Sequence, residues 1–276
     1  MKKIISLALT LALLLAMTAC GGSSGSSSVP SPGEPGESGE PAPGPEAGPV
    51  TILIAAAASL EYSLRDELIP MFQDKHPNIT VEGTYDSSGK LQTQIEEGLE
   101  ADLFFSAAQK QMNALVEKDL VDAGSVVELL ENKLVVIAAA EGEIRTLPDL
   151  LKAEHVALGD PESVPAGQYA KEALENLGLW ESIQPMVSFG TNVTEVLSWV
   201  AEGSADVGVV YATDAATTDK VVVLTEAPEG SLATPILYPA GIVSASQKKE
   251  AAGLFLEFLQ SEEAMAVFQK YGFAAA

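Results

Sequence analysis

The sequence predicts an α/β fold with mostly parallel sheets and helices on both faces. Two observations predict it. Short apolar runs rich in Val, Ile and Leu alternate along the chain with segments whose apolar residues recur at helical spacing. Parallel strands need crossover connections, commonly helices that pack on the sheet, so this alternation favours sheets covered on both sides.

The expected strands are short, nearly continuous apolar runs, as buried parallel strands usually are. The first of them reads VTILIA and continues into three alanines. We expect strands at residues 50–55, 79–83, 101–107, 134–138, 156–158, 207–211 and 221–224.

The expected helices carry apolar residues three or four positions apart. In the first, Leu60, Leu64, Leu68 and Phe72 recur every four residues before Pro77 ends the pattern. We expect helices at residues 60–72, 89–99, 109–118, 166–177, 191–200, 248–260 and 261–270.

The N-terminus has the features of a secretion signal. Lys2 and Lys3 precede an apolar run of 13 residues, 4–16, which is too short to span a bilayer. The small residues before Cys20, the only cysteine of the chain, resemble the lipobox of bacterial lipoproteins. We therefore expect residues 1–19 to be a lipoprotein signal peptide and Cys20 to be the lipidation site.

Residues 20–49 are expected to form a disordered tether. Gly, Ser and Pro occupy 22 of the 29 positions from 21 to 49, a composition that cannot bury apolar surface. A flexible coil of this length spans about 30 Å on average. The G-x-S-x-G pattern that begins at Gly21 lacks the strand and helix of a hydrolase nucleophile, so it is accidental.

The chain is strongly acidic, with 15 basic and 39 acidic residues and a net charge of −24. Removal of the signal peptide would leave 13 basic residues against 39 acidic ones, or −26. This balance excludes nucleic acid as a partner, because phosphates demand a basic face, and it opposes docking on anionic lipid.

Several kinds of chemical site are excluded by spacing. The stretch from Gly83 to Leu91 has the wrong glycine spacing for a phosphate loop, and Leu91 stands where the magnesium-binding hydroxyl would be. His76 and His155 lie far apart, and no cluster has metal-ligand spacing. No general base is evident near Ser88, which opposes a hydrolase.

Small uncharged residues recur where a strand or loop gives way to a helix. Ser and Asn at such positions are usually simple caps, and Asn192 and Glu195 have the spacing of a capping box. Helix N-termini also favour anions, because their N–H groups are free and the dipole is positive there. These positions are Ser59, Ser88, the turn 165–167, residues 192–193 and, at a strand end, Tyr211.

Six stretches make a resemblance specific. They are AAASL, YDSSGKLQTQI, ADLFFSA, GDPESVPAGQYAKEAL, GVVYATDA and FQKYGF, in this order. Over residues 51–273 the chain resembles the periplasmic molybdate-binding (ModA-type) proteins of bacterial ABC importers. The resemblance implies a two-lobed binding protein of class II that is not an enzyme, with lobe 1 formed by residues 50–132 plus 237–276 and lobe 2 by residues 133–236.

The resemblance also implies a ligand and its donors. Molybdate or tungstate would be clamped between the lobes by neutral groups and delivered to a membrane permease by a monomeric receptor without a cofactor. The metal would belong to the oxyanion, with no direct metal-ion ligands in the protein. Ser59 and Ser88 would donate hydroxyl and backbone N–H groups, Ala166 and Val193 backbone N–H groups, and Tyr211 its phenol.

Other ligands remain open for this fold. Sulfate is smaller than molybdate, and phosphate keeps a proton near neutral pH that would require an acceptor. Ferric ion would require paired tyrosines, and Tyr211 has no adjacent tyrosine. Lys90 is expected to be a solvated side chain, although it lies beside Ser88. A hydrolase that uses Ser88 is the alternative from a different class.

Overall fold

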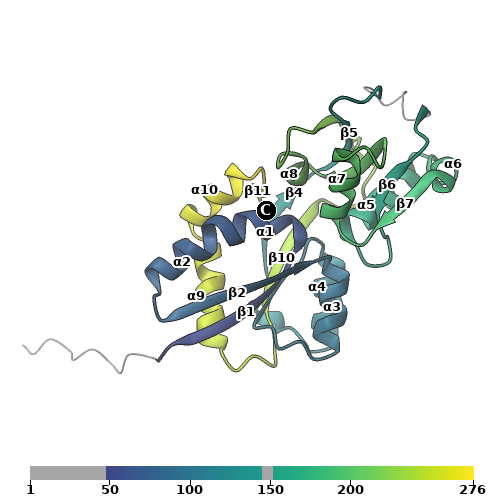
Figure 1. The fold of residues 1–276 in the computed structure, drawn as a ribbon. Helices are drawn as coiled ribbons and strands as arrows, with labels where there is room; N and C mark the ends of the chain where they lie inside the picture. Colours follow the sequence, from purple (N-terminus) through teal and green to yellow (C-terminus); the bar gives the residue numbers. More distant parts are fainter. Residues whose placement is uncertain (1–47, 145–151) are drawn as a thin grey trace, which may run out of the picture. The chain divides into compact units, whose positions relative to one another are not determined.

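The computed structural model describes residues 48–144 and 152–276 (Figure 1). These residues all belong to one compact unit, Ala47–Ala276. The expected signal peptide, Cys20 and nearly all of the tether lie outside the described residues.

The described strands form two sheets. The first has the order β11-β4-β10-β3-β1-β2 and the second the order β7-β6-β8-β5-β9. The strands of the first sheet are β1 (Val50–Ala57), β2 (Ile79–Asp86), β3 (Leu103–Phe105), β4 (Val127–Asn132), β10 (Ile236–Ile242) and β11 (Ala274–Ala275). Those of the second are β5 (Leu134–Ala139), β6 (Val156–Gly159), β7 (Val187–Gly190), β8 (Val207–Tyr211) and β9 (Val221–Glu226).

Both sheets are mixed, which corrects the expectation that they are mostly parallel. Parallel pairing joins β1 with β2 and β3, and β6 with β7 and β8. Antiparallel pairing joins β10 with β3 and β4, β11 with β4, and β5 with β8 and β9. The antiparallel pairs arise where the chain passes between the sheets, because β4 leads directly into β5 and β9 leads back to β10.

Helices follow most of the parallel strands, as the apolar spacing predicts. The longer ones among the described residues are α2 (Ile69–Lys75), α3 (Ser88–Glu96), α4 (Gln109–Glu117), α5 (Pro165–Asn176), α7 (Val193–Ala201), α9 (Lys249–Leu259) and α10 (Glu262–Lys270). Short helices are α1 (Glu61–Ser63), α6 (Trp180–Ile183) and α8 (Ala212–Ala215).

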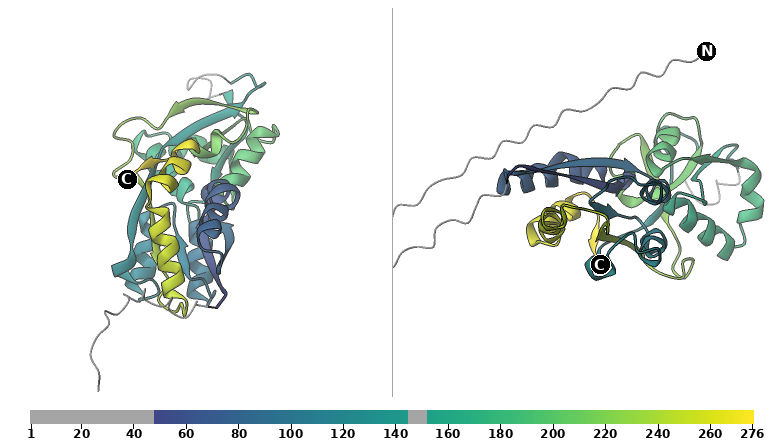
Figure 2. Two further views of the ribbon diagram at one scale, coloured as in Figure 1. Left: turned by 90° about the vertical axis from the view of Figure 1, so that its left-hand side faces the viewer. Right: turned by 90° about the horizontal axis from the view of Figure 1, so that it is seen from below.

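The first sheet is covered on both faces, as the alternation of its buried residues requires. Ile52 and Ile54 belong to a core cluster that includes Phe255 of α9. Ala55, which points to the opposite face, packs in a separate cluster with Leu91 of α3. Figure 2 shows α9 on one side of this sheet and α3 with α4 on the other. A two-sided core of this kind fixes the strand ends from which the candidate site is built.

A π-helical turn explains the four-residue spacing in the first helical segment. The segment runs from α1 through the π-helical turn Leu64–Leu68 into α2, and the N–H of Ile69 bonds the carbonyl of Leu64, five residues back. A spacing of four residues drifts around a regular α-helix of 3.6 residues per turn. The wider turn compensates, so Leu60, Leu64, Leu68 and Phe72 are all fully buried. Pro70 follows directly, where it has no N–H to give.

Candidate functional site

All five residues expected at the site line one cavity. Ser59 and Ser88 reach it from the first-sheet half of the fold, and Ala166, Val193 and Tyr211 from the second-sheet half. The cavity is small, about 10 Å³, which is room for roughly one water-sized sphere. Its other lining residues are Ala57, Ala58, Ser87, Ala107, Val164 and Pro165.

Ser88 is a fully buried residue that does not act as a helix cap. It is the first residue of α3, and its hydroxyl oxygen accepts a 2.9 Å hydrogen bond from the N–H of Ala107. A hydroxyl that accepts through its oxygen keeps its hydrogen for another acceptor. The Ser88 hydroxyl is therefore available as a donor in the cavity, together with the N–H of Ser88, which has no partner within α3.

Ser87 is a cavity residue to which the sequence reasoning gave no role. It precedes α3 at the cap position, yet its side chain makes no capping bond. Its hydroxyl is buried and has no hydrogen-bond partner among the described residues. The signal was present in the sequence, because Ser87 and Ser88 are adjacent at the same helix start.

The start of α5 is shaped by a tight approach between helix and strand. The carbonyl of Asp160 accepts from the N–H groups of Ser163 and Val164 at 3.1 and 2.7 Å, which turns the chain into the helix. A Cβ atom at Gly167 would lie 2.0 Å from the carbonyl oxygen of Gly159, so only glycine allows α5 this close to β6. The cap residue Val164 has no polar side chain, so the N–H of Ala166 in the first turn stays free.

The start of α7 has the predicted Asn192 cap. The Asn192 side chain accepts from the N–H of Glu195 at 2.9 Å. The Glu195 carboxylate does not complete a regular capping box, because it accepts from the N–H and hydroxyl of Thr191 at 2.6 and 2.9 Å. Val193 is thus the first helical residue, where a backbone N–H has no intrahelical partner.

Tyr211 and Ser59 complete the lining with hydroxyl groups. Tyr211 is 1 % exposed at the end of β8, and its hydroxyl lies 3.4 Å from the carbonyl oxygen of Ala107. Burial raises the pKa of Tyr211 well above its ordinary value, so its phenol keeps its hydrogen at neutral pH. The Ser59 hydroxyl lies 3.0 Å from the hydroxyl of Tyr238, a residue of β10.

Charge beside the cavity is paired. Lys90 does not line the cavity and its side chain is 36 % exposed, as expected of a solvated lysine, but its ammonium also lies 3.2 Å from the carboxylate of Asp86 at the end of β2. Asp86 also accepts from the N–H of Ser87 at 2.8 Å. The pair leaves little net charge next to the cavity.

Elements from both halves meet around the cavity. The Gln111 side chain of α4 donates to Gln168 of α5 at 3.1 Å. The Asn192 amide lies 3.4 Å from the carboxylate of Asp86. Side chains of the two halves therefore contact one another beside the cavity, the arrangement expected of a ligand clamp.

The histidines and other candidate groups lie elsewhere. His76 stacks on Phe72 with ring centroids 4.5 Å apart, and neither His76 nor His155 lines the cavity. Within residues 48–144 and 152–276, no three His, Cys, Asp or Glu side chains gather as metal ligands. No helix within the same residues has the length and apolar character needed to cross a bilayer.

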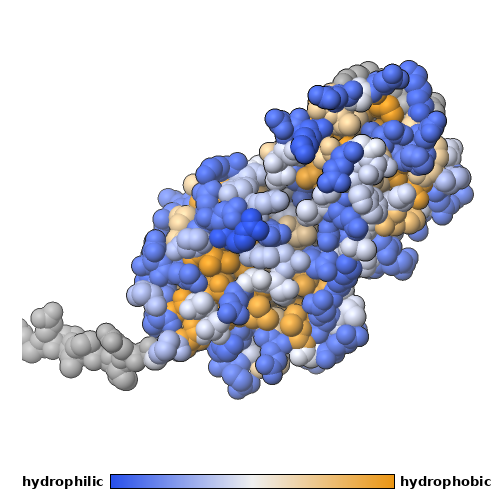
Figure 3. Space-filling view, in the orientation of Figure 1, coloured by the Kyte–Doolittle hydropathy of each residue, from blue (hydrophilic) through white to orange (hydrophobic). Residues whose placement is uncertain are grey.

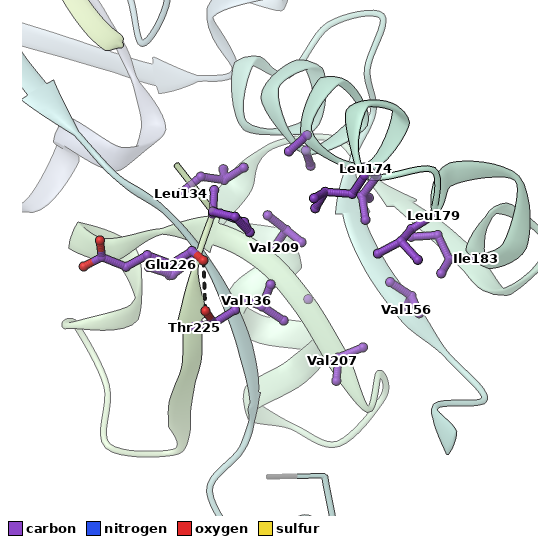
Figure 4. A pocket seen from close by; sticks show the side chains of 17 residues that line it. Leu134, Val136, Val156, Leu174, Leu179, Ile183, Val207, Val209, Thr225 and Glu226 are labelled. Atoms are coloured by element: carbon purple, nitrogen blue, oxygen red, sulfur yellow. Dashed lines mark hydrogen bonds between the residues drawn. The ribbon is translucent and has the colours of Figure 1, made fainter. Parts of the chain in front are cut away.

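A larger cavity of about 260 Å³ lies under α5 and α6 on the second sheet (Figure 4). Apolar side chains such as Val136, Val156 and Leu174 line it, and none of the five expected residues does. The hydroxyl of Thr225 there already donates to the carbonyl of Glu226 at 3.0 Å. An oxyanion needs several donors, so the smaller, donor-lined cavity is the candidate site.

Comparisons with known proteins agree with this fold. The family model of bacterial extracellular solute-binding proteins matches residues 52–274, so the chain belongs to that family.

The chain is similar to the putative ABC transporter substrate-binding lipoprotein YvgL of Bacillus subtilis, with 42% identity over 82% of this chain and 87% of the relative. It is also similar to the molybdate-binding protein ModA of Escherichia coli, with 35% identity over 80% of this chain and 88% of that one. A solved structure of the substrate-binding domain of a putative molybdenum ABC transporter from Clostridium difficile superimposes with a TM-score of 0.65 and 38% identity. This match covers 82% of this chain and 99% of that structure.

Proposed function

We propose that this protein is a receptor for molybdate and tungstate that delivers the oxyanion to the permease of an ABC importer. The observation that carries the proposal is the chemistry of the cavity. Hydroxyl groups and first-turn N–H groups converge there, while no Asp, Glu, His or Lys is among the described residues that line it. A fully deprotonated oxyanion offers only acceptors and therefore suits a site made only of donors.

The same chemistry distinguishes the proposal from its rivals. Hydrogen phosphate would bring a proton that needs an acceptor, and sulfate would leave some fixed donors unpaired, at about 1–3 kcal/mol for each buried group. A hydrolase that uses Ser88 would need a general base beside its hydroxyl, and the described cavity residues include none. We therefore propose that the protein is not an enzyme and uses no cofactor.

Titration calorimetry of the purified protein with molybdate, tungstate, sulfate and phosphate tests the ligand. Molybdate and tungstate should bind, and sulfate and phosphate should bind at least about tenfold more weakly, the effect of one unpaired donor. Equal affinities for sulfate and molybdate would contradict the proposal that sulfate leaves fixed donors unpaired.

Variants of Ser88 test the place of binding. Ser88→Ala should weaken molybdate binding, and Ser88→Asp should abolish it by setting a carboxylate against the anion. Tyr211→Phe should resemble Ser88→Ala. Ser182→Asp adds the same charge at an exposed position of α6 and should bind like the wild type. Wild-type binding by Ser88→Asp would show that Ser88 does not line the site.

We also propose that the mature protein is a monomer tethered outside the cytoplasm by a lipid on Cys20. Support comes from the lone cysteine and from YvgL, the 42% identical relative described as a lipoprotein. Cys20→Ser should abolish labelling by a fatty-acid analogue in growing cells. A wild-type protein that is never labelled would contradict the anchor.

A further inference from the structure

Tyr238 lies directly behind Ser59, outside the set of expected donors. It belongs to β10, is fully buried, and packs between the rings of Tyr211 and Phe273. Its hydroxyl has two neighbours, the Ser59 hydroxyl at 3.0 Å and the Asn132 side-chain amide at 3.1 Å. The direction of these two hydrogen bonds decides what Ser59 offers to a ligand.

The orientation of the Asn132 amide is fixed by the backbone. The N–H of Lys133, which can only donate, bonds Oδ1 of Asn132 at 2.8 Å. Nδ2 is therefore the atom that faces Tyr238 and Thr213, and it donates to both hydroxyl oxygens, at 3.1 and 2.9 Å. Asn132 is the last residue of β4, just before the chain enters the second sheet. Its amide bonds Tyr238 of β10 in the first sheet and Thr213 of α8 in the second-sheet half.

The Tyr238 hydroxyl has one hydrogen, and the Ser59 oxygen lies at hydrogen-bond distance to accept it. The Tyr238 oxygen accepts from Asn132, while the adjacent Tyr211 phenol gives its own hydrogen to the carbonyl of Ala107. The phenol stays protonated, because burial raises the pKa of Tyr238 well above its ordinary value. Tyr238 therefore donates to the oxygen of Ser59, and the hydrogen of the Ser59 hydroxyl is left for the cavity.

We propose that the chain Asn132–Tyr238–Ser59, called here the hydroxyl relay, holds Ser59 as a hydrogen-bond donor and so makes the site select fully deprotonated oxyanions. The proposal rests on the function proposed above. A serine hydroxyl left to itself donates or accepts, and would tolerate a protonated ligand. The relay occupies one of the two acceptor positions of the Ser59 oxygen and leaves its hydrogen free for the ligand, as the N–H of Ala107 does for Ser88, so donation becomes the favoured role. Hydrogen bonds in such a chain also strengthen one another.

A double-mutant cycle of Tyr238→Phe and Ser59→Ala tests the relay, with molybdate affinity measured by titration calorimetry. Tyr238→Phe keeps the buried ring and should weaken binding about 3- to 10-fold, the effect of one hydrogen bond. In the Ser59→Ala background the same change should have no further effect, because the relay acts only through Ser59. Competition experiments should show that Tyr238→Phe also lowers the ratio of the affinity for molybdate to the affinity for hydrogen phosphate.

Additive losses in the cycle would overturn the proposal, since a purely structural role of Tyr238 does not depend on Ser59. Asn132→Ala breaks the relay one residue further back and gives a second cycle if Tyr238→Phe folds poorly, which thermal unfolding will reveal. Tyr85→Phe, which removes a buried hydroxyl with no partner among the described residues, should keep wild-type affinity. A wild-type protein that binds no molybdate would contradict the proposed function, whereas binding with an additive cycle would contradict the relay alone.

Discussion

The backbone N–H of Gly89 donates to the carbonyl of Ser163 at 3.0 Å, which ties the start of α3 to the loop before α5. The two residues belong to different halves of the fold and flank the candidate cavity. A Cβ atom at Gly89 would lie 2.4 Å from the Ser163 carbonyl oxygen. Glycine at this position therefore permits the two halves to meet.

Gly89→Ala should weaken molybdate binding by about tenfold or more without unfolding the protein. The added methyl group collides with Ser163 only when the halves are in contact, while alanine is the better helix former by about 1 kcal/mol. Calorimetry should show the weaker binding, and thermal unfolding of the free protein should show no loss.

Gly253→Ala in α9 is the matched control, because its added Cβ atom has only the tip of Ile242 within 4.0 Å. It should leave molybdate affinity unchanged and raise stability by up to about 1 kcal/mol. Equal affinities for both alanine variants would contradict the role assigned to Gly89.

Asp214→Asn should change how stability depends on pH. Asp214 is buried against Tyr211 and Tyr238, both neutral, and burial raises its pKa to about 7. Between about pH 4 and pH 7 the unfolded state has lost this proton and the folded state has kept it, so the contribution of Asp214 to stability falls as pH rises through that window.

Chemical denaturation at pH 5 and pH 8 measures this effect. The free energy of unfolding of Asp214→Asn, relative to the wild type, should be greater at pH 8 by roughly 2–4 kcal/mol. The exposed Asp219→Asn, five residues along the chain, should show no such change. The same stability difference at both pH values would mean that Asp214 is not held protonated.

Tyr85→Phe should stabilise the protein by about 1 kcal/mol, because a buried polar group without a partner carries its desolvation penalty. The Tyr85 hydroxyl is buried against Gly83, has no partner among the described residues, and has a pKa raised to about 12 by burial. Thermal unfolding measures the gain. The exposed Tyr62→Phe is the control, and a lower melting temperature for Tyr85→Phe would reveal a bonded hydroxyl.

Asp102→Ala should destabilise the fold by about 2–4 kcal/mol. The buried Asp102 carboxylate accepts from the N–H of Leu53 at 2.8 Å, the hydroxyl of Ser246 at 2.7 Å and the ammonium of Lys248 at 3.2 Å. Lys248→Ala should cost under about 1 kcal/mol, because the Lys248 side chain is 42 % exposed. Equal losses in denaturant unfolding would mean that the ion pair, not the buried acceptor, dominates.

Local pattern was sufficient for much of the fold but only for candidate positions of the site. Apolar runs predicted β1, β5 and β8, and small residues marked several helix starts, while the resemblance to ModA-type proteins selected the five residues that the structure brings to one cavity. These features depend on neighbours in the sequence, which is what periodicity and capping rules describe.

Strand β10 was missed because its sequence opposes a central strand. It contains Pro239, which cannot donate to a neighbouring strand, yet it lies between β3 and β4. The register of β10 against β4 shifts between Tyr238 and Pro239, and this irregularity accommodates the proline.

The hydrogen bond between Tyr238 and Ser59 could not be predicted from the sequence either. The two residues are 179 positions apart and meet only because β10 returns antiparallel beside β3. Ser87, by contrast, was within reach of local reasoning, since it stands next to Ser88 at the same helix start.

The π-helical turn at Leu64–Leu68 also bears on insertions and deletions. It holds one residue more than a regular turn, and Arg65 and Asp66 within it are exposed. Deletion of either residue would place the leucines now at 64 and 68 three positions apart. Three positions is also a helical spacing, so both leucines would stay on the buried face. The narrower turn would then bring the ring of Pro70 against a carbonyl of the preceding turn. Homologues that are one residue shorter here are therefore expected to lack this proline.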